Sequence, residues 1–151
     1  MIDIKLLEQL CLCNGISGDE GNVRNLIINE IKDCADDIKT DNLGNLIVFK
    51  KGKKSAKSKL MVSAHMDEVG LMVTDITSDG YLKFDEVGGI DRRVLPGKRV
   101  CVGRNGLNGV IGVKPIHLTN GDEKTAVPKM NDMYIDIGAE SREDALKYVN
   151  Y

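Results

Sequence analysis

His65 and Asp67 are the residues of this sequence with the clearest chemical potential, and they form an H-x-D pattern directly after a short apolar run. A neutral imidazole is a common ligand for zinc or cobalt. Two residues apart on an extended chain, both side chains leave on one face, so the carboxylate can hydrogen-bond a ring nitrogen and orient the ligand. On its own, however, the tripeptide more often marks a structural histidine, so the metal-ligand hypothesis needs support from the rest of the chain.

The segments before this pattern are expected to position it. The apolar run Leu60–Ala64 predicts a buried strand that delivers His65 at its C-terminal end, where sites of open α/β sheets lie. Hydrophobic periodicity predicts two helices and two strands upstream, over residues 3–13, 18–35, 38–40 and 46–49. Ser17 and Glu20 are predicted to form a capping box for the second helix. The lysine-rich stretch 50–59 is predicted to be a solvated loop, with an anionic partner as the weaker alternative.

After Gly70 the pattern changes to short strands separated by turns. They are predicted over residues 71–76, 81–84, 99–102, 109–113 and 133–138, which favours a small barrel or sandwich. Residues 117–132 are polar and unpatterned, so we expect a long mobile loop. Ser141 is predicted to cap a final helix that places Ala145, Leu146 and Val149 on one side.

The bulk composition excludes several classes of protein. Of the 151 residues, 42% are hydrophobic and 29% charged, which is typical of a globular chain. The net charge of −2 and the absence of a long apolar run favour neither a nucleic-acid partner nor a membrane. No signal peptide is evident, and the four cysteines form no CxxC pair, so we expect reduced thiols, buried or half-buried, in a cytoplasmic protein.

A resemblance to a known family rests on six segments that occur in order and with matching spacing: Gly15–Glu20, Asp41–Leu46, Ala64–Gly70, Val94–Val100, Gly109–Gly112 and Tyr134–Ala139. Together they resemble the glutamyl and deblocking aminopeptidase family, whose members form tetrahedral particles and sometimes carry an endoglucanase label. The resemblance covers nearly the whole chain, so it is far more specific than any single motif.

The resemblance implies an α/β fold in which residues 1–67 are the first segment of a phosphorylase/hydrolase-like catalytic domain. Residues 68–151 would be a β-rich, PDZ-like barrel domain that drives homo-oligomerisation, with its exit helix. It implies a metal-dependent aminopeptidase that uses two divalent ions, zinc or cobalt, to hydrolyse N-terminal residues from peptide substrates. The family's metal-ligand histidine corresponds to His65, and its catalytic-site aspartate, which orients that histidine, corresponds to Asp67.

The family places its bridging aspartate, its general-base glutamate and its remaining metal ligands after the inserted domain. We therefore expect this chain to be a truncated portion, inactive alone, with at most one weak metal site. Apolar faces of the first two helices and of residues 60–64 should then be exposed, swapped between chains or disordered. His117 lies in a segment that the family shares without using it as a ligand, and Glu68 should face away from Asp67 along a strand, so neither is assigned a role.

Two other functions remain open. The chain could be a non-catalytic dimerisation module, which a dimer without bound metal would favour. It could also be a glycoside hydrolase, which needs two carboxylates flanking the glycosidic bond. Asp67 and Glu68 are adjacent in sequence and should point apart, so the aminopeptidase hypothesis is the stronger one.

Overall fold

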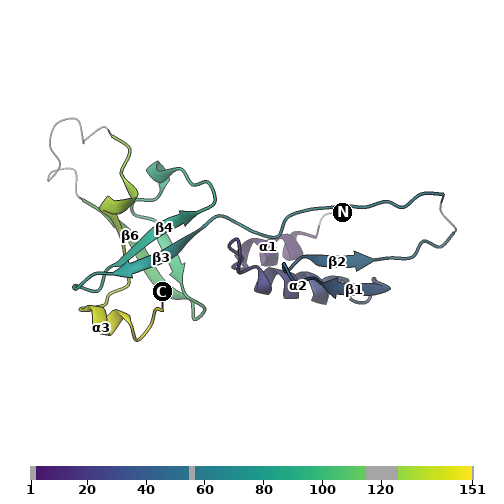
Figure 1. Ribbon diagram of the computed structural model, residues 1–151, viewed down its shortest axis with the longest axis horizontal. Coiled ribbons are helices and arrows are strands. Elements are labelled where there is room, and N and C mark those ends of the chain that lie inside the picture. The colour runs from purple at the N-terminus through teal and green to yellow at the C-terminus, as the bar shows by residue number, and fades with distance from the viewer. Residues whose placement is uncertain (1–2, 55–56, 115–125, 151) are drawn as a thin grey trace. The chain divides into compact units, whose positions relative to one another are not determined.

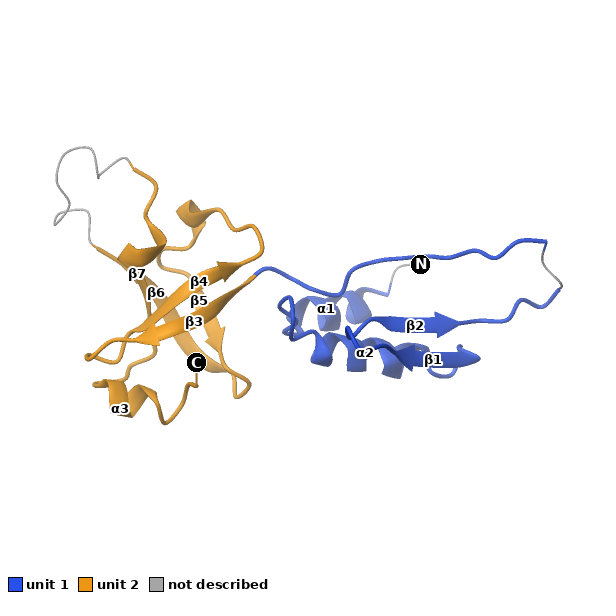
Figure 2. Cartoon of the chain, viewed as in Figure 1, with its two compact units in different colours: residues 1–69 blue, residues 70–151 orange. Residues whose placement is uncertain are grey.

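The computed structural model describes residues 3–54, 57–114 and 126–150. The chain divides into two compact units, Met1–Val69 and Gly70–Tyr151, which Figure 2 shows in blue and orange. Each unit has its own hydrogen-bonded elements. In the described part of the chain, no helix is long and apolar enough to cross a membrane.

Unit 1 begins with two helices, α1 (Ile4–Leu12) and α2 (Gly21–Ile31). The second is shorter than the predicted span 18–35. The predicted capping box is wrong, because the N-cap residue of α2 is Glu20 and makes no side-chain capping bond. Its carboxylate instead accepts a hydrogen bond from the backbone N–H of Gly18 at 2.6 Å, which leaves the Ser17 hydroxyl available for another contact.

A β-hairpin follows, formed by β1 (Asp37–Thr40) and β2 (Leu46–Phe49) in antiparallel register, as the sequence predicts. The carboxylate of Asp41 closes its turn by accepting from the backbone N–H of Leu43 and from both the backbone and the side-chain amide of Asn45, at 2.9–3.0 Å. The side-chain bond from Asn45 is the main cause of the lowered pKa of Asp41. Arg24 of α2 donates to the carbonyl of Gly44 at 2.9 Å and so ties the helix to this turn.

The run Leu60–Ala64 does not form the buried strand that its composition predicts. Leu60, Met61 and Val62 are 85–91% exposed, and no strand is assigned there. A strand needs a neighbour for its backbone hydrogen bonds, and none lies beside this segment among the described residues. Leu7 and Leu12 of α1 are exposed as well, which agrees with the expectation of uncovered apolar faces in this unit.

Unit 2 is built on one curled antiparallel sheet (Figure 1), whose five strands, all labelled in Figure 2, lie in the order β3–β4–β7–β6–β5. The strand bounds are β3 Gly70–Ile76, β4 Leu82–Val87, β5 Arg99–Val102, β6 Leu107–Val113 and β7 Met133–Asp136. A 3-10 helix, η1 (Arg92–Val94), lies between β4 and β5. These strands overlap the predicted segments, because short apolar and β-branched runs separated by turn residues mark them in the sequence. The molecule is therefore mixed α/β.

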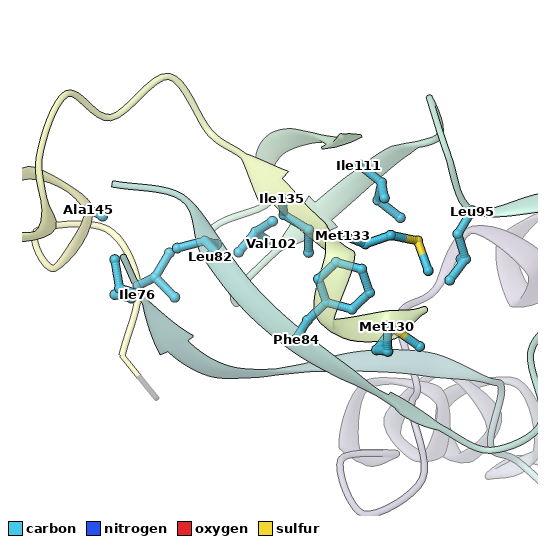
Figure 3. Close-up of a cluster of buried hydrophobic side chains, with 11 residues drawn as sticks. Ile76, Leu82, Phe84, Leu95, Val102, Ile111, Met130, Met133, Ile135 and Ala145 are labelled. Atoms are coloured by element: carbon cyan, nitrogen blue, oxygen red, sulfur yellow. The ribbon is translucent and has the colours of Figure 1, made fainter. Parts of the chain in front are cut away.

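The hydrophobic core of the described residues lies almost entirely in unit 2 (Figure 3). Ile76, Leu82, Ile111 and Met133 are less than 2% exposed and come from four different strands. In unit 1, by contrast, Val23 is the buried hydrophobic residue that the described part contains. Unit 2 thus has the burial needed for independent stability, whereas unit 1 has little.

The last helix, α3 (Arg142–Ala145), covers one end of this core. Ser141 accepts a hydrogen bond from the backbone N–H of Asp144 at 3.2 Å, so the predicted cap is confirmed. Ala145 and Val149 are buried as expected, but Leu146 is 43% exposed, and its predicted place on the same side is wrong.

The segment predicted to be a mobile loop lies in part outside the described residues, which exclude 115–125. Where it is described it contains a 3-10 helix, η4 (Met130–Asp132), and Met130 is buried in the core. The prediction of an unpatterned loop is therefore wrong at this end, because a single apolar residue carries no periodicity. Three of the four thiols, those of Cys11, Cys34 and Cys101, are exposed rather than buried.

Candidate metal-ligand site

His65 presents its imidazole to solvent, with its side chain 85% exposed. Its Nδ1 atom lies 3.0 Å from the backbone oxygen of Asp67 and 3.1 Å from the carboxylate Oδ1 of the same residue. The Ser17 hydroxyl, followed by His65, lowers the pKa of Asp67, so this carboxylate is ionised at neutral pH. Both neighbours of Nδ1 can then only accept, so in the neutral imidazole the hydrogen lies on Nδ1 and Nε2 carries the lone pair.

Ser17 provides the second contact to the carboxylate. Its hydroxyl donates a short hydrogen bond to Oδ2 of Asp67, on the oxygen opposite the one that faces His65. The sequence gives no sign of this contact, because Ser17 and Asp67 are 50 positions apart. A three-member chain of side chains therefore runs from Ser17 through Asp67 to His65.

The loop between α1 and α2 is fastened to the segment that carries these residues. The backbone N–H of Glu68 donates to the carbonyl of Gly15 at 2.8 Å, and the backbone N–H of Gly15 donates to the Glu68 carboxylate at 3.2 Å. Ile16 and Glu68 form an isolated parallel β-bridge. The carboxylate of Glu68 thus holds the loop at Gly15, and the sequence assigns it no role in the site.

Gly15 is required here by space. A Cβ atom at this position would lie 2.4 Å from Cγ2 of Val23, the buried residue of α2, and 3.6 Å from the carbonyl oxygen of Met66. Contacts below 3.0 Å are essentially never seen for a real Cβ. The glycine lets the loop lie between α2 and residues 66–68 and so brings Ser17 within reach of Asp67.

His65 and Asp67 line an open groove of about 690 Å³ that lies within unit 1. The other residues that line it are Glu20, Ile27 and Ile31, Asp41 and Leu43–Val48, and Met61–Ala64 with Met66. Many of these residues are apolar, and the polar side chains among the lining residues are those of Glu20, Asp41, Asn45, Ser63, His65 and Asp67. A groove that combines apolar walls with polar groups is a common form of ligand site.

The two residues predicted for the site therefore lie in contact, and the Nε2 lone pair of His65 suits a divalent metal ion. In the described residues, no group of three or more His, Cys, Asp or Glu side chains is placed to hold such an ion, so His65 offers one ligand only. Sequence reasoning missed Ser17 as part of this site. Its position three residues before Glu20 matched a capping box, and no local signal pointed to a carboxylate 50 residues away.

Comparison with known proteins identifies a family whose model matches most of this chain. Residues 44–151 match the family model of the M42 glutamyl aminopeptidases. A lysyl aminopeptidase from Pyrococcus furiosus is 36% identical over 149 residues, which are 96% of this chain and 42% of that protein. The chain spans about two fifths of the length of the curated relatives that it matches first.

The fold of this chain is also similar to that of solved structures. The TET1 peptidase of Pyrococcus horikoshii, which can assemble into a tetrahedron or a large octahedral shell, superposes with a TM-score of 0.83 at 47% identity, covering 97% of this chain and 44% of that one. A Thermotoga maritima protein described as an endoglucanase superposes with a TM-score of 0.81 at 45% identity, covering 95% of this chain and 42% of that one.

Proposed function

This chain belongs to the M42 glutamyl aminopeptidase family, and on that premise we propose that the protein carrying it removes N-terminal residues from peptides in a metal-dependent reaction. The observation that carries the proposal is the His65 imidazole, which lines the groove with Nδ1 bonded to Asp67 and Nε2 available as a ligand atom. The likeness to a lysyl aminopeptidase supports the same substrate class.

In this proposal each residue of the site has one task. His65 would hold a divalent ion, zinc or cobalt, through Nε2. Asp67 would fix the ring by accepting the Nδ1 hydrogen at 3.1 Å, as carboxylates do for many metal-ligand histidines. When bound, a pair of such ions would polarise the scissile carbonyl and activate water for attack. The other ligands and the general base would come from residues outside the described part of this chain.

The proposal predicts a metal-dependent exopeptidase activity for the protein that carries this chain. It should hydrolyse amino-acyl p-nitroanilides, lose that activity on treatment with a chelator, and regain it when zinc or cobalt is restored, because the ions supply the electrophile. The 151 residues alone should show no turnover. A protein whose aminopeptidase activity persisted after complete metal removal would contradict the proposal.

A second assay tests the alternative of glycoside hydrolysis, which the description of the Thermotoga maritima structure as an endoglucanase raises. A glycoside hydrolase needs two carboxyl groups that face each other across the scissile bond. Asp67 accepts from Ser17 and lies against His65, while Glu68 accepts from Gly15, so both carboxylates hold the local structure together. Release of reducing sugar from carboxymethylcellulose without peptide hydrolysis would reverse the assignment.

We further propose that residues 68–151 act as a PDZ-like dimerisation domain and that the protein is a homo-oligomer. The likeness to a peptidase that assembles into a tetrahedron or an octahedral shell supports this. Met72, Val94 and Tyr148 in this unit are each more than 50% exposed, as apolar side chains at a subunit interface would be in one isolated copy.

The oligomeric state can be measured directly as the mass in solution. Light scattering coupled to size-exclusion chromatography should give a mass of at least twice the 16.6 kDa of one chain, unchanged across a tenfold dilution from about 10 μM, a range in which obligate interfaces persist. A single species of 16.6 kDa over the same range would exclude dimerisation by these residues.

A further inference from the structure

Ser17 is the member of the site for which the metal-ligand hypothesis gives no role. We propose that Ser17 is a positioning residue, whose hydroxyl holds one oxygen of Asp67 so that the other oxygen stays bonded to the His65 ring. The inference rests on the proposed function, because the direction of the ring matters only if Nε2 must meet a metal ion.

The two oxygens of Asp67 have separate partners. Oδ2 accepts from the Ser17 hydroxyl, and Oδ1 lies 3.1 Å from Nδ1 of His65. A carboxylate without a second partner can rotate about its terminal torsion, which has broad minima. The Asp67 side chain is 39% exposed, so packing alone does not prevent that rotation. The bond from Ser17 removes this freedom and assigns Oδ1 to the imidazole.

Ser17 is itself held in place by the loop that carries it. The paired bonds between Gly15 and Glu68 and the β-bridge at Ile16 fix the backbone on the N-terminal side of Ser17. On the other side, the backbone N–H of Asp19 donates to the carbonyl of Ile16 at 2.9 Å. The hydroxyl is therefore presented to Asp67 by a fixed backbone, which is the condition for effective preorganisation.

Capping does not explain the serine. Glu20 is the N-cap residue of α2, and Ser17 makes no capping bond there. Loss of its hydroxyl would leave α2 intact while the His65 ring kept only the carbonyl of Asp67 at 3.0 Å as a fixed acceptor. The expected consequence is a ring held by one acceptor in place of two, with a smaller share of the tautomer that carries its hydrogen on Nδ1, and not an unfolded unit.

The first experiment observes the ring without any metal. The sequence contains two histidines, His65 and His117, so the imidazole ¹⁵N signals of the 151-residue chain can be assigned by one substitution. At a pH where the imidazoles are neutral, the shifts of His65 should report a hydrogen on Nδ1. Ser17→Ala should move them toward a mixture of both tautomers, whereas Ser17→Thr should keep the shifts of the parent chain. Ser58→Ala, at an exposed serine of the same unit, is the matched control.

The second experiment measures binding. In the protein that carries this chain, Ser17→Ala should weaken zinc affinity about 10–100-fold, which is the usual effect of losing a partner behind a metal ligand. Ser17→Thr should restore most of it. If zinc binding fails already in the parent protein, the proposed function is wrong, and the tautomer shifts still test the Ser17 contact. Unchanged tautomer shifts and unchanged zinc affinity in Ser17→Ala would overturn the inference about Ser17 alone.

Discussion

Replacing His65 with alanine in the protein that carries this chain should lower aminopeptidase activity by at least about 100-fold. The loss of a residue behind a ligand costs up to that factor, and the loss of the ligand itself should cost no less. The substitution removes the imidazole that Asp67 holds through Nδ1 and that carries the proposed ligand atom, Nε2. Turnover of an amino-acyl p-nitroanilide and zinc content per chain, measured by mass spectrometry, should fall together.

The matched control for this substitution is His117→Ala at the second histidine of the chain. It should retain the zinc content and turnover of the parent protein. Full activity and full zinc content in His65→Ala would remove this residue from the metal site, whatever the activity of the complete protein. A loss confined to turnover, with zinc retained, would also contradict its role as a ligand.

The largest effect on stability is expected from Leu82→Ala. Leu82 is fully buried, pairs with Ile135 across β4 and β7, and belongs to the core of unit 2. Truncation of a buried leucine to alanine removes apolar contacts and leaves a cavity, at a cost of about 2–5 kcal/mol. A cost of that size is a large part of the stability of a small domain. The midpoint of urea unfolding should fall accordingly.

Tyrosine fluorescence makes this measurement specific to unit 2. The chain has no tryptophan, and its four tyrosines all lie in residues 81–151. Val127→Ala is the control, because Val127 belongs to the same unit and is 52% exposed, and such substitutions usually change stability by no more than about 0.5 kcal/mol. Equal unfolding midpoints for Leu82→Ala and Val127→Ala, at one protein concentration, would show that the described core does not stabilise this unit.

Elements with a regular apolar pattern could be predicted from the sequence. The hairpin of β1 and β2 and the five strands of unit 2 follow from short apolar and β-branched runs between turn residues, which are a local property. Leu60–Ala64 has the composition of a buried strand, but burial depends on a neighbour that the local sequence does not encode. The burial of Met130 could not be predicted for a related reason, since one apolar residue in a polar stretch gives no hydrophobic period.

The contact between the two residues predicted for the site could also be predicted. His65 and Asp67 are two residues apart, so their contact follows from chain geometry. Ser17 was misassigned because two uses compete for a serine at that point of the sequence. A cap three residues before Glu20 is a local bond, whereas the contact with Asp67 requires the loop and residues 66–68 to meet. Side chains that act across such distances need coordinates to be found.

The close approach at Gly15 has a consequence for how this sequence can change over evolutionary time. Any side chain at position 15 meets Cγ2 of Val23, so the two positions cannot vary independently. A lineage that acquires alanine at position 15 has to shorten residue 23 in the same step or displace the loop that presents Ser17. Substitutions at Val23, a buried helix residue with no chemical role, are thereby restricted by the position that the Ser17 hydroxyl must hold to contact Asp67.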